Sequence, residues 1–301
     1  MSERDLGASV RQRLLNQSRA QVRPFQELLQ YFAMERFLYR LAKSPFADRF
    51  ILKGALLLTA WRAPLSRPTI DIDLAGRTNN QLDHIEEVVG TVCGITVEPD
   101  GIEFDQASIE VSRIKEDADY AGVRVRFYAT LARARISMQL DIAFGDIITP
   151  APTEIEYPTL LDFPAPVLRI YSKETVVAEK LEALTALGIL NSRMKDYYDL
   201  ALLSRMYPFE GALLAEAIVA TFCHRGTTIE AEPIGLTQTY CNDPARVLQW
   251  RAFVRRSRFG GETADLTRLV DEIKPFALPL LSAVTAESPF KARWKPGGPW
   301  E

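Results

Sequence analysis

Two aspartates, Asp71 and Asp73, stand two positions apart in the segment PTIDIDLAG. In a β-strand, side chains at positions i and i+2 point to the same face, and Ile70, Ile72 and Leu74 would then occupy the opposite face. Two carboxylates this close repel each other unless a cation neutralises them. Their oxygens suit magnesium, which can bridge phosphate oxygens during phosphoryl transfer. On this pattern alone, an exposed edge strand with two solvated aspartates remains the alternative.

A third carboxylate, Asp141, falls inside a second strand-like segment, ISMQLDIAFG. The apolar residues Met138, Leu140, Ile142 and Phe144 alternate with it, so Asp141 is expected on the polar face of that strand. A third acidic side chain on a nearby strand could complete a cation site or act as general base toward an attacking hydroxyl. An ordinary aspartate on a solvated face is the alternative interpretation.

Two lysines stand where an anion could bind. Lys53 precedes Gly54 between two apolar runs, and a glycine lets the backbone approach a phosphate closely. Lys180 shares a helical stripe with Val176 and Leu184, an unfavourable place for a charge unless it reaches an anion or extends to solvent. A triphosphate would be a suitable partner for Lys180.

The surrounding pattern predicts a β-rich part followed by a helical part. Residues 109–115, 122–129 and 136–145 read as consecutive antiparallel strands. The Pro-rich stretch 150–166 marks a boundary between a lobe over 1–160 and a helical lobe over 161–301. Helical periodicity is expected over 8–46, 79–90, 173–189, 195–206, 209–223, 243–257 and 262–275.

Composition narrows the class of protein. The chain has 301 residues, 25% of them charged, a net charge of −3 and three cysteines that fit neither a zinc pattern nor a disulfide framework. The first residues are too polar for a signal peptide, and no apolar run approaches the ~20 residues that cross a membrane, so a cytoplasmic protein without a membrane anchor is expected. There is no P-loop, Ser-His-Asp or Cys-His pattern.

Four short motifs in order give a resemblance to a known family. They are Lys53-Gly54, Arg67-Pro68-Thr69-Ile70-Asp71-Ile72-Asp73, Glu179-Lys180-Leu181 and Lys195-Asp196-Tyr197-Tyr198-Asp199-Leu200. Over residues 45–225 the chain resembles the AbiEii/AbiGii toxins, which are polymerase-β-like nucleotidyltransferases. Ala55 and Leu56 depart from the family pattern, which has a second glycine and then a small hydroxyl residue.

The resemblance implies a fold and a division of roles. The fold would be α/β of the α+β type: a nucleotidyltransferase lobe with a mixed, mainly antiparallel sheet, and a helical lobe closing a cleft. Asp71, Asp73 and Asp141 would hold Mg²⁺ or Mn²⁺. The remaining expected residues, which would bind the nucleotide or assist catalysis, are Lys53, Gly54, Arg67, Thr69, Lys180 and Asp196, with Asp199 as the rival of Asp196.

The same resemblance implies a reaction and a setting. A nucleoside monophosphate would pass from an NTP to a hydroxyl, for example at a tRNA 3′ end, in a bacterial toxin–antitoxin or abortive-infection system with a separately encoded antitoxin. Arginines near the strands (Arg124, Arg126, Arg133, Arg135) and near one helix end (Arg251, Arg255, Arg256, Arg258) could contact RNA phosphates or simply be solvated. A metal-dependent phosphohydrolase, a protein-modifying transferase and an inactive nucleotide-binding module are the alternatives.

Overall fold

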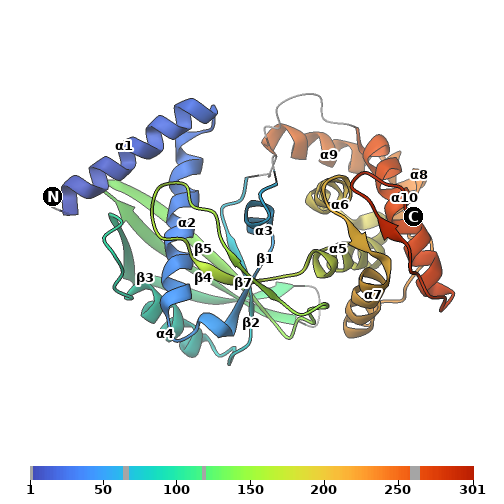
Figure 1. Ribbon diagram of the computed structural model, residues 1–301, viewed down its shortest axis with the longest axis horizontal. Coiled ribbons are helices and arrows are strands. Elements are labelled where there is room, and N and C mark those ends of the chain that lie inside the picture. The colour runs from blue at the N-terminus through green and yellow to red at the C-terminus, as the bar shows by residue number, and fades with distance from the viewer. Residues whose placement is uncertain (1–2, 64–67, 117–119, 258–264) are drawn as a thin grey trace. The chain divides into compact units, whose positions relative to one another are not determined.

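The computed structural model describes residues 3–63, 68–116, 120–257 and 265–301. The chain divides into two compact units. The first comprises Met1–Asp146 and Thr153–Ile170, and the second comprises Ile147–Pro152 and Tyr171–Glu301. Figure 1 shows the sheet and the first helices in the first unit and a group of helices in the second.

A mixed sheet of seven strands in the order β3-β4-β5-β2-β1-β7-β6 forms the centre of the first unit. The predicted antiparallel run β3-β4-β5 is present, whereas β5 pairs with β2, and β1 with β7, in parallel. This architecture confirms the expected mixed α/β class. The strands are β1 Phe50–Lys53, β2 Ile72–Gly76, β3 Ile102–Glu116, β4 Tyr120–Leu131, β5 Ala134–Phe144, β6 Thr153–Glu156 and β7 Val167–Ile170.

Helices cover one face of this sheet. The ring of Phe37, on α2 (Phe25–Lys43), lies 5.4 Å from that of Phe127 on β4 and 5.9 Å from that of Phe104 on β3. Val125 and Phe127 are fully buried beneath this contact, so the alternating residues Arg124 and Arg126 are on the opposite face. The other helices of the unit are α1 Glu3–Gln21, η1 Ala47–Arg49, α3 Leu56–Ala60 and α4 Leu82–Cys93.

The single helix expected over 8–46 is wrong, because two helices occupy that segment. α1 ends at Gln21, Val22 adopts a left-handed φ of 53°, and Pro24 caps the start of α2. Proline has no amide hydrogen, and its ring clashes with the preceding turn, which excludes it from a helix interior and permits it at a start. The strand around Asp71 is also shorter than expected: it begins at Ile72, and Ile70 is 70% exposed.

Helices make up most of the second unit. Ser172 begins α5 by accepting a hydrogen bond from the Thr175 amide at 3.1 Å, and Asp265 begins α10 through the Arg268 amide at 2.8 Å. No helix in the described part of the chain is both long and apolar enough to span a membrane. The elements are α5 Lys173–Leu187, η2 Gly188–Leu190, α6 Met194–Met206, β8 Phe209–Glu210, α7 Gly211–Arg225, η3 Ile234–Leu236, α8 Gln238–Cys241, α9 Pro244–Ser257, α10 Leu266–Thr285 and β9 Arg293–Trp294.

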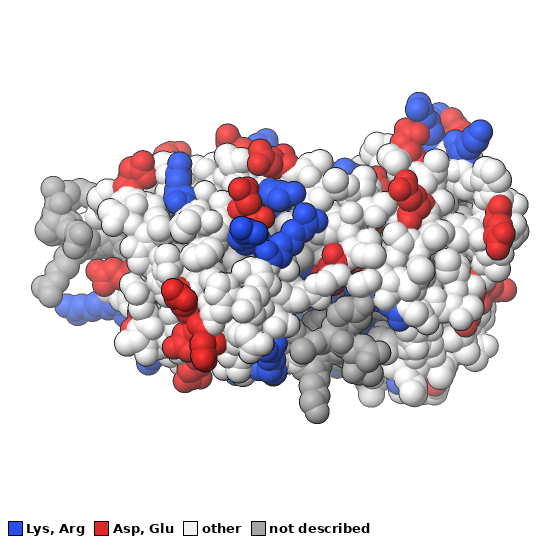
Figure 2. Space-filling model, turned by 90° about the horizontal axis from the view of Figure 1, so that it is seen from below, with Lys and Arg blue, Asp and Glu red and all other residues white. Residues whose placement is uncertain are grey.

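Charged side chains of both signs share the surface. Figure 2 shows Lys and Arg side chains interspersed with Asp and Glu side chains across the visible face. This mixture agrees with the small net charge of −3. Electrostatic attraction for a polyanion would therefore have to come from local arrangements of charge.

Candidate active site

The three predicted carboxylates meet on the face of the sheet that α2 leaves uncovered. Asp73 on β2 is the register partner of Asp141 on the neighbouring parallel strand β5, and Asp71 comes directly before β2. One carboxylate oxygen from each of Asp71, Asp73 and Asp141 lies within 4.8 Å of the other two. All three side chains are half-buried, so these like charges are close together and partly shielded from water.

The segment before β2 is fixed by hydrogen bonds from two directions. Gln30, a buried residue of α2, donates from its amide nitrogen to the carbonyl of Ile70 at 3.2 Å and to that of Ser137 on β5 at 3.0 Å. The buried hydroxyl of Thr69 donates to the carboxylate of Asp71. Through Gln30, α2 therefore holds the residue Ile70 before β2 close to β5, and Thr69 orients Asp71.

Gly54 lies directly against Asp73. Its φ of +70° is a left-handed conformation that favours glycine, and a Cβ atom here would stand 1.9 Å from Oδ2 of Asp73. The sequence predicted close approach to a phosphate at this glycine, and the structure shows close approach to a site carboxylate. Leu56, the departure from the family pattern, is a buried residue at the start of α3.

Two basic residues flank the pair of register partners. Lys53 on β1 is in register with Asp73, and its Nζ lies 2.7 Å from Oδ2 of Asp146. Arg124 on β4 is in register with Asp141 and donates to both of its carboxylate oxygens, each at 2.7 Å. The adjacent strands β1, β2, β5 and β4 thus carry a row of charges. In that order they are the positive Lys53, the negative Asp73 and Asp141, and the positive Arg124.

The donor set fits a divalent cation. Three carboxylate oxygens within 4.8 Å of one another are hard ligands of the kind that Mg²⁺ and Mn²⁺ prefer. The described residues contain no other group of three or more His, Cys, Asp or Glu side chains that meets the same criterion. Asp71 and Asp73 are far from Asp141 in the sequence, so it is the fold that brings the three carboxylates together.

A second charged cluster, in the second unit, contains Lys180. Its Nζ lies 2.8 Å from Oδ1 of Asp196 and 2.8 Å from Oδ2 of Asp199, both on α6. Arg193 donates to the other oxygen of Asp196 at 2.6 Å. Burial of Asp196 acts to raise its pKa, but Lys180 and Arg193 outweigh it and lower the pKa to about 2. Asp196 and Asp199, the two alternatives for one site position, therefore both form an ion pair with Lys180.

The tyrosine that follows Asp196 in the fourth motif packs inside the second unit. Tyr197 is fully buried, stacks on Tyr240 at 5.1 Å and donates to the Gly235 carbonyl, so it is a packing residue. Arg67 and Arg258 lie outside the described residues.

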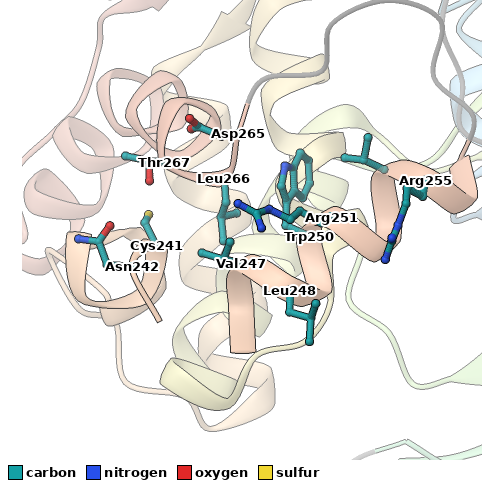
Figure 3. A pocket seen from close by; sticks show the side chains of 11 residues that line it. Cys241, Asn242, Val247, Leu248, Trp250, Arg251, Arg255, Asp265, Leu266 and Thr267 are labelled. Atoms are coloured by element: carbon teal, nitrogen blue, oxygen red, sulfur yellow. The ribbon is translucent and has the colours of Figure 1, made fainter. Parts of the chain in front are cut away.

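A pocket of about 720 Å³ opens among α8, α9 and the start of α10 (Figure 3). Its floor includes the buried Trp250, and the basic side chains of Arg251 and Arg255 line it. The remaining lining residues are Cys241, Asn242, Val247, Leu248, Val254, Asp265, Leu266 and Thr267. All of them belong to the second unit, and none is a residue of the carboxylate cluster.

Comparisons with known proteins found a family match and two similar solved structures. The family described as nucleotidyl transferase AbiEii toxin, type IV TA system, matches residues 36–274. The crystal structure of a proposed nucleotidyltransferase from H. pylori has a TM-score of 0.50 at 18% identity, covering 87% of this chain and 96% of that one. That of JHP933 from Helicobacter pylori has a TM-score of 0.48 at 17% identity, covering 87% of this chain and 93% of that one. No curated protein sequence matches significantly.

The family match and the fold define the class of the protein as a nucleotidyltransferase. The chain belongs to the AbiEii nucleotidyltransferase toxin family of type IV toxin–antitoxin systems.

Proposed function

We propose that the protein transfers a nucleoside monophosphate from an NTP to an acceptor hydroxyl on RNA, at a tRNA 3′ end, and that this reaction depends on a divalent cation. The observation that carries the proposal is the convergence of Asp71, Asp73 and Asp141 on one face of the sheet. In the reaction, the acceptor hydroxyl loses its proton to solvent and its oxygen forms a bond to the α-phosphorus. The bond between the α-phosphorus and the bridging oxygen breaks, and pyrophosphate leaves.

The three carboxylates are proposed as the ligands of Mg²⁺ or Mn²⁺. When bound, the cation would offset negative charge on the phosphate oxygens. Thr69 would keep one oxygen of Asp71 engaged and so fix the orientation of the other. We assign Asp141 the role of ligand, because one of its oxygens lies within 4.8 Å of a carboxylate oxygen of Asp71 and of Asp73.

The other expected residues are proposed to bind the nucleotide. Lys53 and Gly54 stand beside Asp73, where the amine of Lys53 suits phosphate oxygens. Lys180 is a proposed phosphate ligand whose position is set by Asp196 and Asp199. The motif resemblance supports this role for Lys180.

The family setting supports the remaining proposals. A separately encoded antitoxin would counter the activity, because the family is that of a type IV toxin–antitoxin system. Expression without that antitoxin is expected to arrest bacterial growth, and the arrest should depend on Asp73.

A transfer assay tests the proposed reaction. Each α-labelled NTP is incubated with the protein, Mg²⁺ and total RNA, with Asp73→Asn as the matched variant, since asparagine keeps the shape and removes the charge. Label in the tRNA band with wild type, and its absence with the variant, is expected. Label on protein alone would contradict the RNA acceptor, and equal labelling by Asp73→Asn would contradict the site.

A further inference from the structure

Arg124 has a contact that the proposed reaction leaves unexplained. Its Nε donates to Oδ1 of Asp141 and its Nη2 to Oδ2, each at 2.7 Å, which is a two-point ion pair. The Gln139 amide adds a third bond to Oδ2, at 3.3 Å. The Asp141 side chain is 13% exposed and that of Arg124 is 30% exposed, so water screens this pair only in part. Asp141, a proposed ligand of the divalent metal ion, is thus already paired with the positively charged side chain of Arg124.

The charge balance of the row explains why the pair forms. Asp71, Asp73 and Asp141 together would carry three negative charges within a few ångströms. Arg124 offsets the charge of Asp141. A divalent cation at the same carboxylates would lie close to the guanidinium, and two positive charges that are partly shielded from water repel each other.

We propose that Arg124 is the built-in counter-ion of the carboxylate cluster and competes with the divalent cation for Asp141, a role that rests on the proposed function of this site. Binding of the cation weakens the Arg124–Asp141 pair, and the released guanidinium takes a phosphate group of the nucleotide as its new two-point partner. The free protein consequently holds the cation weakly, and the nucleotide and the cation bind more tightly together than either binds alone.

The chain contains matched controls for this proposal. Arg126 is on the same face of β4, two positions further along. It is exposed, and its Nε donates to the Gln139 side chain at 3.3 Å instead of to Asp141. Arg126→Gln therefore removes the same charge from the same strand without touching the ion pair. Arg124→Lys keeps the charge but loses the two-point geometry.

The test measures Mn²⁺ affinity of the purified protein by electron paramagnetic resonance, with and without an α,β-methylene NTP. For Arg124→Gln, Mn²⁺ alone is expected to bind about 10-fold more tightly than to wild type, and the gain in Mn²⁺ affinity from the NTP analogue should shrink. Arg126→Gln should match wild type, and Arg124→Lys should stay close to it. Equal or weaker binding of Mn²⁺ by Arg124→Gln overturns the proposal.

Two further measurements distinguish failure of the proposed role of Arg124 from failure of the proposed metal site. If Asp73→Asn abolishes Mn²⁺ binding while Arg124→Gln binds no more tightly, the proposed active site stands and the role of Arg124 falls. If Asp73→Asn binds Mn²⁺ like wild type, the metal site itself is wrong. In the wild type, the Nε–H resonance of Arg124, assigned with Arg124→Lys, should lose protection from solvent exchange as Mg²⁺ is added. An unchanged resonance at saturating Mg²⁺ also overturns the proposal, whether or not the variants fold.

Discussion

Asp73 on β2 and Asp141 on β5 are register partners in neighbouring parallel strands. Partners in register project from the same face, so this pairing alone brings two distant carboxylates together. A slip of one residue between the strands would turn Asp141 toward the face covered by α2 and place Leu140 or Ile142 beside Asp73. The buried apolar residues of both strands oppose such a slip, because it would expose them.

Gly54→Ala should reduce transfer activity at least about 100-fold, because a 1 Å displacement near the chemistry can have that effect. The added Cβ would stand 1.9 Å from Oδ2 of Asp73, so the carboxylate must move. Steady-state transfer rates, with Mn²⁺ affinity on the same samples, check this expectation.

Gly226→Ala is the matched control for that change. Gly226 also has a left-handed φ, of +65°, but an added Cβ would meet nothing within 4 Å. This variant should lose about 1 kcal/mol of stability and keep its transfer rate. Comparable loss of activity in both variants would mean that backbone strain, and not contact with Asp73, is responsible.

Thr69→Val should weaken Mn²⁺ binding by about 10-fold, because outer groups that orient metal ligands have effects of that size. Valine has the shape of threonine but cannot donate to Asp71, whose carboxylate accepts the Thr69 hydroxyl in the structure. Thr69→Ser restores the hydroxyl and should recover most of the affinity. Serine behaving like valine would show that packing at this buried position matters more than the hydrogen bond.

The pKa of Asp196 makes the second unit sensitive to acid. Its folded pKa of about 2 lies below the ordinary 3.8, so the ion cluster adds stability above about pH 4 and loses it as the pH falls toward 2. At neutral pH the contribution is about 2 kcal/mol. Asp196→Asn should therefore lower the free energy of unfolding by that order at pH 7 and by about half as much at pH 3. Urea unfolding at the two pH values measures the difference, and an equal loss at both would contradict this cause.

Lys180→Gln should weaken NTP binding by about 10-fold, the effect of losing a charge-assisted contact to phosphate. Lys274, which pairs with Asp271 on α10, provides a control lysine in the same unit. Lys274→Gln should leave NTP affinity unchanged. Isothermal titration with the NTP analogue separates this role from a purely structural one: lower thermal stability with normal NTP affinity would assign Lys180 to the ion cluster alone.

The sequence predicted which face of a strand each side chain occupies, but not which strands lie next to each other in the sheet. Alternation of apolar and polar residues placed Asp73 and Asp141 correctly on polar faces. It carried no information that β2 and β5 pair in parallel, because that pairing depends on the packing of the whole sheet. Asp71 and Ile70 were expected inside the strand, but the strand starts at Ile72, where pairing with β5 begins.

The sequence contained a signal for the pairing of Arg124 with Asp141 that was not used. The tight turn between β4 and β5, where Leu131 pairs with Ala134, fixes the register of the hairpin and therefore pairs Arg124 with Asp141. From the sequence, Arg124 was expected either to contact RNA phosphates or to be solvated, and not to pair with Asp141. Pro24 was a second unused signal, since a proline in a long helical pattern marks a break.

The most direct test of the central claim is an anomalous difference map from crystals grown with Mn²⁺ and the α,β-methylene NTP. We predict a peak within coordination distance of carboxylate oxygens from Asp71, Asp73 and Asp141, in contact with the phosphates of the nucleotide. A map in which Mn²⁺ and the nucleotide bind elsewhere, with the three carboxylates contacting neither, would contradict the account.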